Sequence, residues 1–329
     1  MRRPLKHNNH DLFDYLSDDI VIFILTKFSS TAASPSQFFT IFLICKRLKR
    51  LGFHPMVLSK AGPKVFAIKP KNWSDRSHLF LRRCVTDGNV DACYTLGMIR
   101  FYCLQNRRSG LSLIAKAATK MHAPALYSLA VIQFNGSGGS KHDKDLRAGV
   151  ALSARASLLG HLDALRELGH CLQDGYGVKQ NISQGRKLLV HANLRELLLI
   201  LRAVMLASPS PPSSSSTPLT LSGLNDLSVP LLSDYGYNVT VREIHPANWF
   251  LREWFESGPG MLNEGLRLCS HMGCGRVETR PHEFRRCSVC SKVNYCSRGC
   301  QSLDWKLRHK RECSTPNLWF DDNDGDIAL

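Results

Sequence analysis

The sequence lacks an apolar run long enough to cross a membrane. A membrane-spanning helix needs about 20 predominantly apolar residues, whereas the longest apolar stretches, at 20–25 and 197–206, are shorter and have charged neighbours. The first 20 residues also lack the apolar segment of a secretory signal. We therefore expect no membrane partner and a reducing location, in the nucleus, the cytoplasm or both.

The sequence also lacks the residue combinations of a catalytic site. The glycine-rich stretch at 136–139 is not followed by the Lys-Ser/Thr pair of a phosphate-binding loop, and no strand is expected before it. No nucleophile, base and acid stand out as a group. We therefore expect a non-catalytic protein, whose 329 residues are enough for two or three domains.

Residues that bind metals, by contrast, are concentrated near the C-terminus. Eight of them form four close pairs: Cys269 with Cys274, Cys287 with Cys290, Cys296 with Cys300, and His309 with Cys313. Eight such ligands suffice for two tetrahedral zinc sites with none left over. Disulfides are the less favoured interpretation, because they need an oxidising compartment. The other five cysteines are scattered and are expected to be buried small hydrophobic residues.

The spacing CxxxxC-x12-CxxC-x5-CxxxC-x8-HxxxC over residues 269–313 resembles a MYND-type zinc finger. The resemblance implies two zinc ions held by interleaved pairs. Cys269, Cys274, Cys296 and Cys300 would bind one ion, and Cys287, Cys290, His309 and Cys313 the other. The first pair departs from the commoner CxxC spacing. Because so short a segment buries little apolar surface, we expect its folding to require both ions.

MYND fingers resemble docking modules for extended, proline-containing peptides. Gln301 and Trp305 match positions used in that docking, and they are four residues apart on the helix expected before His309. The indole ring offers a flat apolar surface to proline, while its N–H and the Gln301 amide can hold backbone groups. The alternative is that Trp305 belongs to the core of the finger. A protein client with a proline-containing motif is therefore one expected partner.

Residues 11–60 have the pattern of a small three-helix core. A capping signal at Ser17 precedes one apolar helix, and a second helix is expected to run from Pro35 to Gly52. The order YLSDDIVIFILTKF, then FLICKRLKRLG, resembles an F-box, although Ser17 stands where that motif usually has proline. The resemblance implies docking to a Skp-type adaptor and, through it, to a cullin. The residues that would face the adaptor are Leu16, Ile20, Ile24, Leu25, Phe39 and Leu43.

Residues 84–206 contain an internal repeat. The segments GNVDACYTLG (88–97), MHAPALYSLA (121–130) and GHLDALRELG (160–169) align without gaps, and a second helix with small residues follows each. Small residues at fixed offsets let helices approach closely, and the leucine that all three share is expected in the core. The pattern resembles Sel-like repeats, which implies an α-solenoid whose concave face can hold a protein segment. A plain helical bundle without a binding role is the alternative.

Two segments are not expected to pack: a Pro/Ser-rich linker at 207–230 and an acidic, flexible tail at 321–329. The predicted fold class is mainly α, with a three-helix F-box, α-solenoid repeats and a small double-zinc finger. The whole arrangement resembles plant F-box proteins that end in a MYND finger. That resemblance implies a substrate-recruiting subunit of a Skp-cullin-F-box ubiquitin ligase. We expect Cys290→Ala to unfold the finger and to leave the repeats helical.

The strong positive charge supports an alternative function. The chain has 43 Lys and Arg residues against 27 Asp and Glu, a formal net charge of +16, and many of the arginines lie among the zinc ligands. Basic surfaces neutralise phosphates, so a basic zinc protein that binds nucleic acid or acts as a transcriptional co-regulator is the alternative. Nucleic acid is nevertheless the less favoured partner, because no helix is spaced to read a DNA groove.

Overall fold

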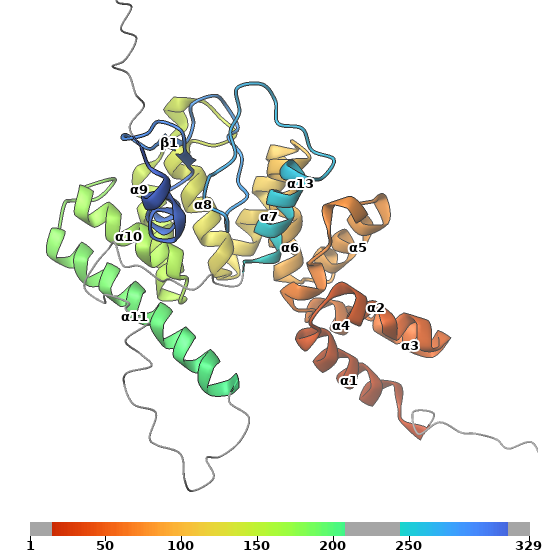
Figure 1. Ribbon diagram of the computed structural model, residues 1–329. Helices are drawn as coiled ribbons and strands as arrows, with labels where there is room; N and C mark the ends of the chain where they lie inside the picture. Colours follow the sequence, from red (N-terminus) through yellow and green to blue (C-terminus); the bar gives the residue numbers. More distant parts are fainter. Residues whose placement is uncertain (1–14, 208–243, 315–329) are drawn as a thin grey trace, which may run out of the picture. The chain divides into compact units, whose positions relative to one another are not determined.

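The computed structural model describes residues 15–207 and 244–314, apart from the side chains of residues 199–207 (Figure 1). The described part is mainly helical, as the sequence predicts. It divides into two compact units, Met1–Ala125 with His245–Met261, and Leu126–Ile244 with Leu262–Leu329. The predicted linker falls almost entirely outside the described residues, and the predicted acidic tail falls wholly outside them.

The N-terminal part consists of α1 (Asp18–Thr31), α2 (Pro35–Ile44), α3 (Lys46–Gly52) and α4 (Pro55–Ser59). The prediction of one helix up to Gly52 is wrong, because Cys45 is extended with φ −155° and its Sγ accepts from Leu48 N. Ser17 also makes no side-chain cap. Instead, Asp18 in the first turn pairs with Arg47 and Arg50, each at 2.8 Å, which joins α1 to α3.

A cluster of aromatic rings joins these helices to α5 (Asp75–Thr86) within the first unit. Phe38 is fully buried and lies edge-on to Phe42, at 5.3 Å between ring centroids. Phe39 contacts Phe80 of α5 at 5.0 Å. The short helices η2 (Pro63–Phe66) and η3 (Pro70–Asn72) connect α4 to α5. The N-terminal helices are therefore packed directly on the first helix of the repeat region.

The repeat region continues through a series of paired helices. These are α6 (Val90–Met98), extended by the π-helix η4 (Ile99–Cys103), then α7 (Arg107–Thr119), α8 (Ala123–Asn135), η5 (Lys141–Asp143), α9 (Leu146–Leu158), α10 (Leu162–Asp174) and α11 (Ile182–Ala207). The three segments that align in the sequence coincide with the starts of α6, α8 and α10. The helices predicted to follow them are α7, α9 and α11. The predicted repeat is therefore confirmed.

Small residues of the repeat lie where two helices cross. A Cβ atom added to Gly97 would lie 2.8 Å from Ile114 Cγ1, and one added to Gly169 would lie 2.8 Å from Leu189 Cγ. Carbon atoms do not approach so closely, so these positions exclude larger side chains. The shared leucine is buried only in the first repeat, at Leu96. Leu129 and Leu168 are half-buried, so the prediction of a core leucine holds in one repeat of three.

Each repeat begins in the same way. Gly88, Met121 and Gly160 hold equivalent positions, and their φ angles are +90°, +60° and +88°. The next residue caps the following helix: Asn89 Oδ1, His122 Nδ1 and His161 Nδ1 accept backbone N–H groups of α6, α8 and α10. Met121 is therefore a non-glycine residue in a backbone conformation that favours glycine.

The chain after the undescribed segment contributes α13 (Pro246–Glu256) to the first unit. Phe250 of α13 is buried and lies edge-on to Trp73 at 5.3 Å. His245, which caps α13, lies edge-on to Tyr94 of α6 at 5.0 Å. Among the described helices, none combines the length and the apolarity needed to span a bilayer.

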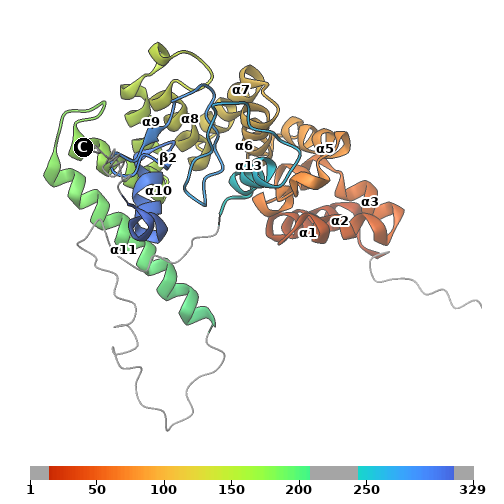
Figure 2. The ribbon, with the colours of Figure 1, turned by 45° about the horizontal axis from the view of Figure 1, so that its top comes forward.

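The C-terminal region contains little regular structure. A two-stranded antiparallel sheet pairs β1 (Arg285–Arg286) with β2 (Asn294–Tyr295). It is followed by α14 (Arg298–Asp304), the π-helix η6 (Trp305–His309) and α15 (Lys310–Glu312), which confirms the helix predicted before Cys313. Within the second unit, two views place this region against α8 and α10 (Figure 1, Figure 2).

Candidate metal centre and its contacts with the repeats

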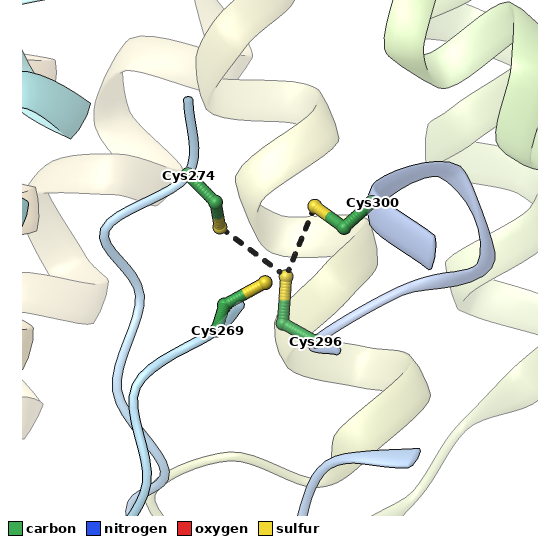
Figure 3. Close-up of side chains that lie close together, drawn as sticks. All are labelled: Cys269, Cys274, Cys296 and Cys300. Carbon is green, nitrogen blue, oxygen red and sulfur yellow. Dashed lines mark hydrogen bonds between the residues drawn. The ribbon is translucent and has the colours of Figure 1, made fainter. Parts of the chain in front are cut away.

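The first predicted ligand set converges on one point. Cys269, Cys274, Cys296 and Cys300 are all buried, and their sulfur atoms lie within 4.8 Å of one another (Figure 3). Cys296 Sγ is 3.4 Å from Cys274 Sγ and 3.6 Å from Cys300 Sγ. Tetrahedral zinc with Zn–S bonds of about 2.3 Å places its sulfur ligands about 3.8 Å apart, whereas a disulfide needs about 2.05 Å. The donor set fits zinc.

The second predicted set forms a separate group. Cys287, Cys290, His309 and Cys313 bring three sulfur atoms and one ring nitrogen within 4.8 Å of one another. Cys287 Sγ is 3.9 Å from Cys313 Sγ, and Cys290 Sγ is 3.5 Å from His309 Nε2. The residues interleave as the sequence predicts, and both groups are consistent with one zinc ion each. Four protein ligands at each site leave no open position for a reacting water molecule.

Tight turns present the paired cysteines. Gly275 follows Cys274 with φ +71°, and Cys269 N donates to Arg276 O at 2.8 Å. At the second pair, Ser291 has φ +56° and donates its N–H to Cys287 O at 3.0 Å. Cys296 precedes α14 and Cys300 lies within it, so the start of the helix brings both sulfur atoms to one side.

The thiol cluster favours one thiolate at a time. Burial raises the pKa of Cys274, but hydrogen bonds from the neighbouring thiols and the nearby Arg276 outweigh it, so the pKa falls well below the usual thiol value. The pKa of Cys300 is well above that value, because its hydrogen bonds to the neighbouring thiols and its burial disfavour a further charge. A divalent cation stabilises all four thiolates together, which is the chemistry that zinc would supply here.

The first ligand set is joined to α8 through backbone and side-chain hydrogen bonds. Asn135 Nδ2 donates to Cys296 O at 2.8 Å, and the Tyr127 and Ser297 hydroxyl oxygens are 3.1 Å apart. Arg276 donates to Cys274 Sγ at 3.3 Å and to Ser128 Oγ at 2.8 Å. The metal ligands and the repeat helix therefore belong to one packed structure.

Glu167 of α10 makes the most buried of these contacts. Its side chain is 1% exposed and accepts from Gly299 N at 2.6 Å and Arg298 N at 3.3 Å, which caps α14 from a different element. Burial raises its pKa, opposed by these N–H groups and by Arg298. The sequence analysis missed this residue. The repeat alignment could have identified it. Glu167 occupies the position that Thr95 and Ser128 hold in the other two repeats, where both are buried, and a carboxylate at a buried position needs partners.

The basic residues among the ligands are largely engaged inside the second unit. Arg280 donates to Asn135 O and Gly136 O at the end of α8. Arg298 pairs with Asp174 at 2.7 Å and lies over the Tyr176 ring at 3.6 Å. Lys306 and Arg308 bond to Asn193 and Asp304, respectively. These cations are therefore occupied within the protein, which weakens the nucleic-acid alternative.

The predicted peptide-binding pair is only partly accessible. Gln301 and Trp305 are both half-buried, and the Trp305 ring lies edge-on to the ligand His309 at 5.7 Å. Trp305 Nε1 is buried without a hydrogen-bond partner among the described residues. Its N–H is therefore not placed to hold a peptide from solution. Docking of proline-containing peptides on the rest of the ring stays a prediction.

The residues predicted to face the adaptor fall into three groups. Ile20, Ile24 and Leu43 are exposed, Leu43 at 85%, and their neighbours Phe23 and Ile44 are exposed as well. Leu16 and Phe39 are half-buried. Leu25 is only 5% exposed and belongs to the core, so it cannot contact a partner in this fold.

A third group of possible ligands occurs in the first unit, but its hydrogen bonds do not suit a metal. Asp91, His122 and His245 bring ligand atoms within 4.8 Å of one another. Both histidines accept a backbone N–H at Nδ1, from Ala125 at 3.3 Å and Ala247 at 3.1 Å. A neutral ring that accepts at Nδ1 is protonated at Nε2, so it has no lone pair to offer there. His122 instead meets Asp91 at 3.1 Å.

Helical repeats packed against a double-zinc finger define the class of protein, and family models agree. The MYND finger matches residues 269–313, and plant tetratrico peptide repeats match residues 63–172. An Escherichia coli protective antigen with an SLR fold aligns with 75% of the chain and 56% of its own at 15% identity, but a TM-score of 0.40 is too low to support an argument.

Two Arabidopsis thaliana proteins are similar along almost the whole chain. F-box protein At1g67340 is 60% identical over 98% of this chain and 86% of its own length. F-box protein At5g50450 is 61% identical over 95% of this chain and 87% of its own length. The chain therefore belongs to this family of F-box proteins with a MYND finger.

Proposed function

We propose that the protein is a non-catalytic, substrate-recruiting subunit of a Skp-cullin-F-box ubiquitin ligase, acting in the nucleus or the cytoplasm. The observation that carries the proposal is an exposed apolar surface on the N-terminal helices, here called the α1–α2 patch. Its members are Ile20, Phe23 and Ile24 on α1, and Leu43 and Ile44 at the end of α2. Several exposed apolar side chains on one small group of helices are typical of a binding surface.

The arrangement of α1 supports docking rather than a packing defect. Val21, Ile22 and Leu25 face the core, while Ile20, Phe23 and Ile24 alternate with them toward solvent. Lys27 lies over the Phe23 ring at 5.5 Å, at the end of the exposed stripe. A helix that is apolar on both sides buries one side within its own domain and needs a partner for the other.

A receptor subunit must also hold its client at a fixed place relative to the adaptor. In the first unit, the aromatic cluster and Asn89 fix the N-terminal helices to the first repeat. Asn89 Nδ2 donates to Leu58 O and Ala61 O, both at 2.8 Å. Because these elements of the first unit pack directly on one another, we infer that the adaptor-facing helices and the first repeat form one body.

The test is adaptor binding by variants of the α1–α2 patch. Ile24→Asp and Leu43→Asp place a charge where docking would desolvate it, so we expect each to weaken binding of a purified Skp-type adaptor at least tenfold. Leu158→Asp on α9 is the matched control, because it places the same charge on an exposed leucine outside the patch. Wild-type adaptor binding by the folded double variant would refute the proposal.

A further inference from the structure

We propose that one surface of the second and third repeats is a docking surface for the chain's own zinc-loaded finger, and that zinc keeps this surface closed. The surface, here called the seat, consists of Tyr127, Ser128, Asn135, Glu167 and Asn193, all within the second unit. All five are buried in this structure. The inference does not depend on the proposed ligase function.

Metal ligands organise the groups that enter the seat. Cys296 supplies the carbonyl that Asn135 binds, and Ser297, which meets Tyr127, is the next residue. Gly299, which donates to Glu167, adjoins the ligand Cys300. These contacts come from short turns and a seven-residue helix, which depend on the metal for their geometry. Loss of zinc therefore removes several contacts at once.

The seat is polar and acidic, so it cannot remain dry without the finger. Glu167 depends on two backbone N–H groups of α14, and a buried carboxylate without partners is strongly destabilising. Asn193 Oδ1 likewise accepts from Lys306 Nζ at 2.9 Å and from Arg166 at 3.1 Å. When the finger leaves, the seat must take up water.

This inference adds to the result expected from Cys290→Ala. The sequence alone predicts an unfolded finger beside repeats that stay helical. If the seat opens, we expect α8 and α10 to stay helical but to lose protection of their amides from hydrogen exchange, because the side that faces the finger becomes hydrated.

Amide hydrogen exchange of the full-length chain tests the proposal. We expect Cys290→Ala to speed exchange at least tenfold in Leu126–Asn135 and Leu162–Asp174, while α5–α7 change little. Chelation of zinc from the wild type, followed by its return, should raise and then restore the same rates. If the variant does not fold, removal and return of zinc in the wild-type protein tests the proposal by itself.

A second variant separates the seat from zinc binding. Glu167→Gln keeps one oxygen acceptor but replaces the other with an NH2 group, which faces a backbone N–H of α14 and cannot accept from it. We therefore expect the variant to keep two zinc ions but to show faster amide exchange in α14. Glu264→Gln, at an exposed position before the finger, is the matched control and should resemble the wild type. Unchanged exchange in α8 and α10 after zinc removal would overturn the proposal.

Discussion

Replacement of Asn89 by alanine tests how firmly the N-terminal helices are attached to the repeats. Asn89 is 2% exposed. Its Oδ1 accepts from Ala92 N at 2.8 Å as the cap of α6, and its Nδ2 donates to Leu58 O and Ala61 O. One side chain therefore serves both the start of a helix and a contact between separate elements.

The size of the effect follows from these three hydrogen bonds. Loss of a helix cap costs about 1 kcal/mol. Ala61 O loses its donor, which costs about 1–2 kcal/mol for a buried group, whereas Leu58 O still accepts from Ala61 N at 3.4 Å and loses less. We therefore expect Asn89→Ala to lower the free energy of unfolding of this region by about 3 kcal/mol.

A matched control isolates the tertiary contacts. Asn106 is exposed, and its side chain caps α7 by accepting from Ser109 N at 3.3 Å, its one side-chain hydrogen bond among the described residues. Asn106→Ala should cost about 1 kcal/mol, the cap alone. Asn89→Asp keeps an acceptor for the cap but sets a carboxylate against two carbonyl oxygens, so it should be destabilising as well.

Hydrogen exchange of the α4 and α6 amides gives the local free energy of opening. The difference of about 2 kcal/mol between the two alanine variants corresponds to roughly 30-fold in the opening constant. If Asn89→Ala and Asn106→Ala have equal effects, or if Asn89→Asp matches the wild type, the two long-range hydrogen bonds contribute nothing and the reasoning fails.

Three further outcomes are expected. Met121→Gly should raise the thermal midpoint, because relief of the left-handed backbone, about 1–2 kcal/mol, exceeds the added freedom of the unfolded chain; a lower midpoint would contradict this. Burial lowers the pKa of His170 to about 4, below the usual value of about 6.5. Between these pH values the unfolded state binds the extra proton, so stability decreases as the pH is lowered, by at most about 1.4 kcal/mol per pH unit. His170→Gln should make the loss of stability on acidification shallower than in the wild type in urea unfolding, and equal slopes would refute the assignment. Metal analysis of the folded protein should find two zinc ions, whereas one or none would refute the two-site assignment.

Local patterns in the sequence predicted local structure well. The zinc ligands could be paired because close spacing places two thiols on one turn, and the repeats could be aligned because buried alanines recur at Ala92, Ala125 and Ala164. The break at Cys45 could not be foreseen, because the segment around it is apolar and basic without a turn residue. The helix continues or stops there according to tertiary packing.

Assignments that depend on which side of an element faces a neighbour were less successful. The run at 20–25 is apolar on every side, so periodicity could not separate the buried Leu25 from the exposed Ile24. The sequence of the finger indicates a basic surface, but Arg280 binds Gly136 O and Arg298 pairs with Asp174 within the second unit. Charge composition gives the net field of a chain but does not tell which charges are paired.

The unequal surroundings of the two metal sites set the order in which the ions would leave. All four sulfur ligands of the first site are buried, and Asn135 and Arg276 bind its ligands directly. The second site includes Cys313, which is partly exposed. A chelator therefore reaches the second ion first. Because the finger is expected to need both ions to fold, that first loss already weakens the contacts of the finger with the repeats, and the more exposed site sets the zinc level at which they are released.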